Sequence, residues 1–113
     1  FEKSVAFYKK TLSLTPNNAT ALNNLAWLYA TSKDSRFFRP EKALELALQA
    51  AELSQEAHIL DTLAESYYAN GRYAEALKTG KQAQSLATEN KAYYRMQLKK
   101  FEEAMERPFT SRF

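Results

Sequence analysis

The sequence predicts an all-α protein in which antiparallel helix pairs stack side by side as an α-solenoid. Three observations support this fold class: apolar residues recur at helical spacing, the spacing repeats along the chain, and turn residues separate the copies. The 113 residues are 45% hydrophobic and include only 2 glycines and 3 prolines. This composition is typical of a folded helical chain and argues against disordered segments and turn-rich β folds.

Two spacing patterns alternate along the chain. The first places a bulky residue, a leucine, an alanine and a tyrosine at i, i+3, i+4 and i+7, on one face of a helix. It occurs at Leu22, Leu25, Ala26, Tyr29 and at Leu60, Leu63, Ala64, Tyr67. The second, at i, i+4, i+7 and i+10, is made mostly of small residues, which let a neighbouring helix approach closely. It occurs at Ser4, Tyr8, Thr11, Leu14, at Ala43, Ala47, Ala50, Leu53 and at Ala76, Gly80, Ala83, Leu86.

The first two helices are predicted over 2–14 and 18–31, with a turn at Thr15-Pro16-Asn17-Asn18 between them. Proline ends the first helix, and asparagine is a favoured N-cap for the second. A loop follows at 32–39. Leu22 and Ala43 are 21 residues apart, whereas the matching Leu60 and Ala76 are 16 apart, so this loop contains five inserted residues.

The remaining helices are predicted over 40–54, 57–69, 73–87 and 90–106. Pro40 suits the first position of a helix, and Asn70-Gly71 offers a residue with positive φ at a helix end. Gly80, inside the fifth helix, is expected to permit a close helix contact. The last helix is expected to pack on helix 73–87 through a stripe of Tyr94, Leu98, Phe101 and Met105.

A helix–turn–helix unit with these spacings, an Asn-Gly turn and an alanine-rich second helix resembles the tetratricopeptide repeat, whose period is about 34 residues. The motif is clearest at 60–77, and the resemblance covers about residues 1–90. It implies one domain, 1–113, forming a right-handed superhelix of about two and a half repeats and a cap. The expected divisions are the second helix of a truncated repeat (1–18), a repeat with the inserted loop (19–56), a second repeat (57–90), a capping helix (91–106) and a tail (107–113).

The resemblance implies that the first helix of each pair lines a concave groove, which binds a protein or peptide ligand. Rotation by about 100° per residue identifies the face of each helix opposite its core. The predicted partner-binding residues are Thr20, Asn23, Asn24, Trp27, His58, Asp61, Thr62, Glu65, Arg95 and Lys99. Asp61 and Glu65 beside Arg95 and Lys99 predict a groove of mixed charge. Trp27 has two open interpretations, a binding anchor or a residue covered by a neighbouring helix.

Two further surfaces are candidates for contacts. The inserted loop carries Phe37 and Phe38 between arginines, and one phenylalanine is expected to pack back over the helix turn; the alternative is a second contact point for a partner. Helix 2–14 lacks a preceding partner helix, so Val5, Tyr8 and Leu12 are expected to be exposed. Such exposure predicts either further repeats upstream or self-association through this face.

Several classes of function are disfavoured by composition. The net charge of +3 is too small, and its distribution too scattered, to indicate nucleic-acid binding. There is no cysteine and one histidine, so neither an enzyme nor a metal or other cofactor is expected. No apolar run is long enough for a membrane span. The compartment stays open, with the cytoplasm as the default and the periplasm or secretion as alternatives, since the chain starts at Phe1.

The expected function is therefore a protein–protein interaction module, a piece of a larger tetratricopeptide protein. Two alternatives remain open from the sequence: a structural or self-assembly segment of a scaffold, and a regulatory domain of a larger enzyme.

Overall fold

The structure, a computed structural model, describes residues 2–107. This part of the chain forms six α-helices and no strands, which confirms the all-α prediction. The helices are α1 (Glu2–Leu14), α2 (Ala19–Thr31), α3 (Pro40–Leu53), α4 (Ala57–Ala69), α5 (Tyr73–Leu86) and α6 (Lys91–Glu106). No boundary differs from its predicted position by more than one residue. Apart from Arg107, the predicted tail lies outside the described residues.

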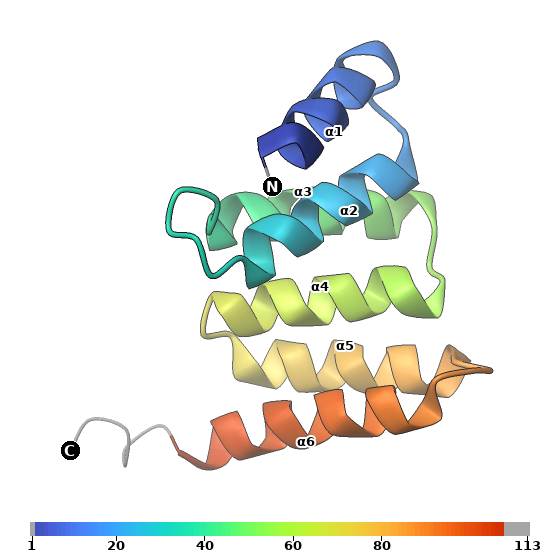
Figure 1. The fold of residues 1–113 in the computed structure, drawn as a ribbon. Helices are drawn as coiled ribbons and strands as arrows, with labels where there is room; N and C mark the ends of the chain where they lie inside the picture. Colours follow the sequence, from blue (N-terminus) through green and yellow to red (C-terminus); the bar gives the residue numbers. More distant parts are fainter. Residues whose placement is uncertain (1, 108–113) are drawn as a thin grey trace.

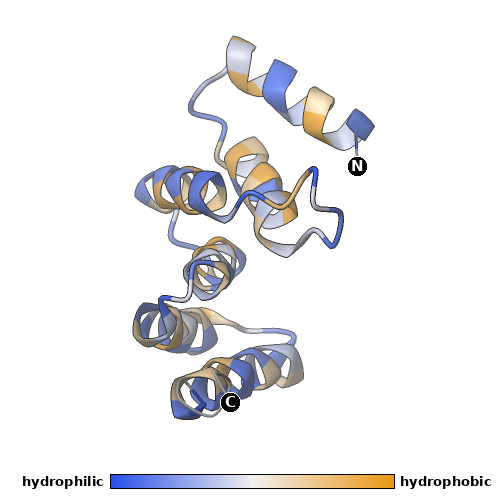
Figure 2. Ribbon diagram, turned by 90° about the vertical axis from the view of Figure 1, so that its left-hand side faces the viewer, coloured by the Kyte–Doolittle hydropathy of each residue, from blue (hydrophilic) through white to orange (hydrophobic). Residues whose placement is uncertain are grey.

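The helices follow one another from one end of the described chain to the other (Figure 1). Each helix packs on the next in sequence, and α2 also packs on α4. After a quarter turn, α3 and α5 lie to one side, whereas α2 and α6 lie to the other (Figure 2). Side chains of α2, α4 and α6 line a common cavity, which belongs to the candidate site.

The turn chemistry agrees with the sequence predictions. The Asn18 side chain accepts a hydrogen bond from the backbone N–H of Ala21 at 3.0 Å and so caps α2. Pro40 is the first residue of α3. Gly71 has a φ of 75°, the left-handed conformation expected after α4. The Asn70 side-chain amide donates to the carbonyl oxygen of Pro40 at 2.7 Å, so it ties the end of α4 to the start of α3.

Small residues of the second pattern lie at helix contacts in α3 and α5. Ala43, Ala47 and Ala50 of α3 are all buried in the main core. In α5, Gly80 faces α6, and a Cβ built on it would lie 3.0 Å from Cε2 of the Phe101 ring. The predicted role of Gly80 as a close-contact residue is therefore confirmed.

The contact stripe of α6 differs from the prediction at its end. Tyr94, Leu98 and Phe101 are buried as expected, but Met105 is exposed. The buried stripe continues instead to Ala104, one position earlier. The reason is geometric, because the contact follows the i+3 step after Phe101 and this step leaves Met105 turned toward solvent.

The expectation that α1 exposes its apolar face is wrong. Val5 is only 8% exposed, and Tyr8 and Leu12 are partly buried against the core, because α1 packs on α2 and covers them. The exposed apolar residues of α1 are instead Phe7 (65%) and Leu14 (73%).

Within residues 2–107, no helix has both the length and the apolar character required to cross a membrane.

Candidate functional site

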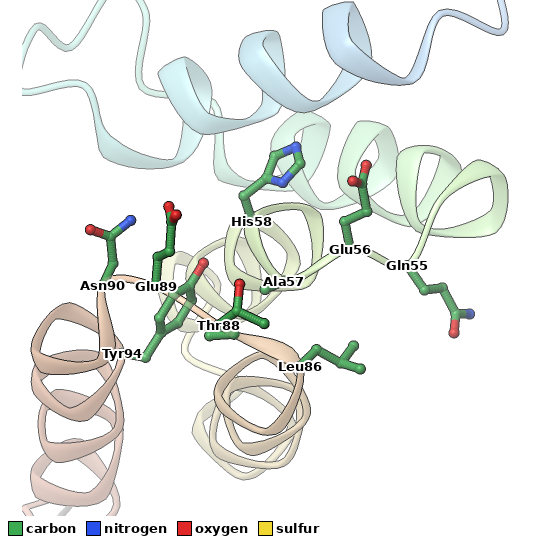
Figure 3. Close-up of a pocket in the computed structure, with 10 residues that line it drawn as sticks. Gln55, Glu56, Ala57, His58, Leu86, Thr88, Glu89, Asn90 and Tyr94 are labelled. Carbon is green, nitrogen blue, oxygen red and sulfur yellow. The ribbon is translucent and has the colours of Figure 1, made fainter.

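Two adjoining cavities lie on the face shared by α2, α4 and α6. The first has a volume of about 420 Å³ and lies between α1, α2, α4 and α6. The second, of about 610 Å³, lies where α4 and α6 begin and α5 ends (Figure 3). Because His58 lines both cavities, we treat them as one surface and call it the inner groove.

The inner groove is defined by the residues that line the two cavities. The first is lined by Ser4, Tyr8, Asn23, Asn24, Trp27, Leu28, His58, Asp61, Thr62 and Tyr93. The second is lined by Gln55, Glu56, Ala57, His58, Leu86, Ala87, Thr88, Glu89, Asn90 and Tyr94. In Figure 3, Glu56 and His58 from the start of α4 and Glu89 and Asn90 from the segment before α6 point toward the same side.

Most of the predicted partner-binding residues come together here. Asn23, Asn24, Trp27, His58, Asp61 and Thr62 all line the first cavity. Thr20, Arg95 and Lys99 are exposed and line neither cavity, and Glu65 is buried and lines neither cavity. Three of the six lining residues, Asn23, Asp61 and Thr62, are themselves buried, so only part of each reaches the cavity.

The mixed-charge groove was predicted from the wrong residues of α6, because Arg95 and Lys99 do not face Asp61 and Glu65. Its residues nearest Asp61 and Glu65 are Tyr93, Gln97 and Lys100, not Arg95 and Lys99. The sequence offered no repeat pattern for α6. The buried stripe Tyr94, Leu98 and Phe101 packs on α5 and so sets the rotation of α6. The residue just before each of these, Tyr93, Gln97 and Lys100, therefore faces α4.

A hydrogen-bond network joins α4 to α6 beneath the groove. The Tyr93 hydroxyl donates to Oδ2 of Asp61 at 2.6 Å. The Gln97 side-chain amide donates to Oδ1 of Asp61 at 3.1 Å and to Oε1 of Glu65 at 2.9 Å. Lys100 Nζ lies 2.6 Å from the same Glu65 oxygen. Each buried carboxylate is therefore satisfied by α6, which fixes the two helices relative to each other.

Burial shifts the acidity of this network. Removal from water raises the pKa of Asp61, and the hydrogen bonds from Tyr93 and Gln97 only partly oppose that shift. Burial also raises the pKa of Tyr93, and the neighbouring Asp61 carboxylate adds to the effect. The Tyr93 hydroxyl therefore stays protonated at neutral pH and remains a donor to Asp61.

One buried acceptor in the groove wall has no donor. Asn23 is 7% exposed, and its Oδ1 accepts no hydrogen bond from any of residues 2–107. Leaving such an atom without a partner costs about 1–3 kcal/mol. Buried polar atoms are rarely unpaired, so this one points to a missing donor.

Trp27 and the inserted loop have different surroundings. Trp27 is partly buried and presents part of its side chain to the first cavity, which leaves both of its interpretations open. In the loop, Phe37 packs against the core beneath the Arg36 guanidinium, whereas Phe38 is exposed. The expectation that one phenylalanine packs back is confirmed.

Sequence reasoning missed half of the groove. It did not identify Ser4 or Tyr8 of α1, or the second cavity with Glu56, Glu89 and Asn90. One signal was available in the sequence, the adjacent residues Tyr93 and Tyr94. Consecutive helix positions point in different directions, so only one of the two rings can enter the core and the other is a candidate for the groove wall.

Comparison of the chain with protein-family models, curated proteins and solved structures finds no match. Its chemistry must be judged from its own side chains. Within residues 2–107, no group of three or more histidine, cysteine and acidic side chains could hold a metal ion. The inner groove offers aromatic surface, amides and carboxylates, groups that bind a ligand reversibly.

Proposed function

We propose that this chain is a tetratricopeptide-type α-solenoid and that its inner groove binds a peptide or a segment of a partner protein. The observation that carries the proposal is the cavity of about 420 Å³ between four helices, with Trp27 and two asparagines in its wall. Large aromatic residues in a partly enclosed hollow are the usual anchors of protein recognition.

The helix arrangement supports the solenoid part of the proposal. The most extensive helix contacts are within the pairs α2–α3 and α4–α5, which carry the two complete copies of the sequence pattern. α2 contacts α4, and α4 is hydrogen-bonded to α6, an arrangement that is expected if these three are the first helices of successive units. Repeat proteins with such neighbour-to-neighbour packing commonly bind ligands on the inner surface.

The groove favours an extended segment over a small molecule. The two cavities share His58 in their linings, and together they run from α1 to the start of α6. This surface is longer than one compact ligand would cover. Asn24 can both donate to and accept from a peptide backbone, and Trp27 can cover an apolar side chain of the ligand.

The proposal is tested by selecting binders from a random peptide library and measuring their affinity through the fluorescence of Trp27, the single tryptophan. Calorimetry is then used for the Trp27→Ala variant, with Thr20→Ala on the same helix as a matched control outside the cavity lining. If Trp27 is an anchor, its loss weakens binding by about 2 kcal/mol, or about thirtyfold, and the control changes little.

Two outcomes count against the proposal. Unchanged affinity for Trp27→Ala with an unchanged circular dichroism spectrum eliminates the anchor role. A library that yields no peptide bound in the groove eliminates peptide binding as the function.

A second candidate, self-assembly, is favoured by one specific observation. Phe7 and Leu14 are seven positions apart on α1, so they lie on one face of the helix, and both are largely exposed. Sedimentation velocity tests it: concentration-dependent association that Phe7→Ser abolishes supports assembly through α1, and a monomer at high concentration contradicts it.

A further inference from the structure

The inner groove is acidic although the chain as a whole is basic. The sequence has 16 lysines and arginines and a net charge of +3. Of the described residues that line the two cavities, three are acidic, Glu56, Asp61 and Glu89, and none is lysine or arginine. The second cavity therefore carries two exposed carboxylates, Glu56 and Glu89, and the wall of the first contains the buried carboxylate of Asp61.

The basic residues of α6 do not neutralise this charge. Lys91, Arg95 and Lys99 are exposed and line neither cavity. Lys100 is the only cation that reaches the buried network among residues 2–107, and it forms its ion pair with Glu65. Asp61 receives hydrogen bonds only from the uncharged donors Tyr93 and Gln97, so its charge is not balanced by an ion pair within the described chain.

Two other features of the groove wall suit a cationic ligand rich in N–H donors. The side chains of Tyr8, Trp27 and Tyr93 line the same cavity as Asp61, and aromatic faces attract lysine and arginine. The buried Oδ1 of Asn23 lacks a donor. Asn23 lines the same cavity, so a ligand N–H is the kind of donor that this oxygen lacks.

We infer that the inner groove selects a basic segment, so that its partner presents lysine or arginine side chains to Glu56, Asp61 and Glu89. The inference rests on the proposed peptide-binding function and specifies its ligand. Its physical basis is charge complementarity, which fixes ligand choice and speeds association. Basic side chains at the Asp61 end lie among the aromatic rings, and those at the other end meet the exposed carboxylates Glu56 and Glu89.

The test uses three synthetic peptides of equal length, made of Gly-Ser-Lys, Gly-Ser-Glu or Gly-Ser-Gln repeats, titrated into the protein while Trp27 fluorescence is followed. The lysine peptide is expected to bind, the glutamine peptide to bind at least about tenfold more weakly, and the glutamate peptide not to bind. Affinity for the lysine peptide should fall several-fold as salt is raised, because added ions screen the exposed carboxylates.

Charge-neutralising variants locate the effect. Glu56→Gln with Glu89→Gln removes two exposed groove charges and should weaken the lysine peptide by about fivefold. Glu102→Gln with Glu103→Gln removes two exposed charges from α6 outside the groove lining, and its effect should stay below about twofold. Both double variants change the net charge equally, so a general electrostatic effect would make them indistinguishable.

The inference and the proposed function can fail separately. If the library of the preceding section yields groove-binding peptides without basic residues, or if the glutamine peptide binds as tightly as the lysine peptide, basic selectivity is wrong and peptide binding stands. If the chain associates with itself and Trp27→Ala abolishes this association while the lysine peptide does not reverse it, the occupant of the groove is a second copy and the basic segment is wrong. If no library peptide binds in the groove, the proposed peptide-binding function is wrong. If the lysine peptide binds both double variants equally well, the basic selectivity of the groove is wrong.

Discussion

Replacing Gly80 by alanine tests a close contact between α5 and α6. A Cβ at this position would lie 3.0 Å from Cε2 of Phe101 and 3.1 Å from Cδ2 of Leu98. Optimal carbon–carbon separations are about 3.5–4.0 Å, so α6 or its side chains would have to move. The Phe101 ring is fully buried and stands 5.5 Å, centre to centre, from the Tyr68 ring, which leaves it little room.

The expected effect is the difference between two opposing contributions. Alanine is favoured over glycine inside a helix by about 1 kcal/mol. Inserting a methyl group into a packed contact costs about 1–3 kcal/mol. Because the ring cannot move freely, the packing cost should exceed the helix preference, and we expect a net destabilisation of about 1 kcal/mol.

Urea unfolding followed by far-ultraviolet circular dichroism measures this change. Gln82→Ala, at an exposed position of the same helix, is the control and should lie within about 0.5 kcal/mol of the native chain. In a Phe101→Leu background the cost of Gly80→Ala should shrink, because the smaller side chain leaves space and the two positions are then energetically coupled.

A stabilising Gly80→Ala substitution would refute this reasoning. A gain of about 1 kcal/mol would mean that helix preference dominates and that α6 does not press against Gly80. An unchanged cost in the Phe101→Leu background would show that the destabilisation has another origin than this contact.

Three further predictions concern single side chains. Asn18→Ala should destabilise the chain by about 1 kcal/mol, measured by thermal unfolding, because it removes the N-cap of α2; no loss would contradict the cap. Gln97→Leu should cost about 1–3 kcal/mol in urea unfolding, because Asp61 and Glu65 each lose a buried donor, and a neutral result would mean that water replaces the amide. The raised pKa of Asp61 means that the folded chain holds this proton to higher pH than the unfolded chain, so the contribution of Asp61 to stability falls as pH rises above the usual aspartate value of 3.8. The urea midpoint of Asp61→Asn should therefore rise relative to that of the native chain across that range, and a relative fall would reverse the assigned direction.

The positions of the helices could be predicted because their causes are local. Helix ends depend on residues within a few positions, such as Asn18 capping α2, Pro40 starting α3 and Gly71 adopting positive φ after α4. The close contact at Gly80 was also accessible, because a stripe of small residues marks a surface that another helix approaches.

The lining of the site was predictable only for the helices that carry the repeated pattern. In α2 and α4 that pattern identifies the core face, so the opposite face could be inferred, and Trp27 and His58 do line the groove. In α6 there was no second copy for comparison, and Arg95 and Lys99 were chosen where Gln97 and Lys100 lie.

The sequence by itself determined six helices, their ends and the alternation of two kinds of helical face, since each depends on neighbours along the chain. Only the tertiary structure decided which side chains of α6 face α4, how the apolar face of α1 packs against α2, and that Asp61 and Glu65 are buried. These depend on residues such as Tyr93 and Gln97, which approach α4 from more than 30 positions away. Burial and charge balance are set by which surfaces meet, and in this chain they convert an expected groove of mixed charge into an acidic one.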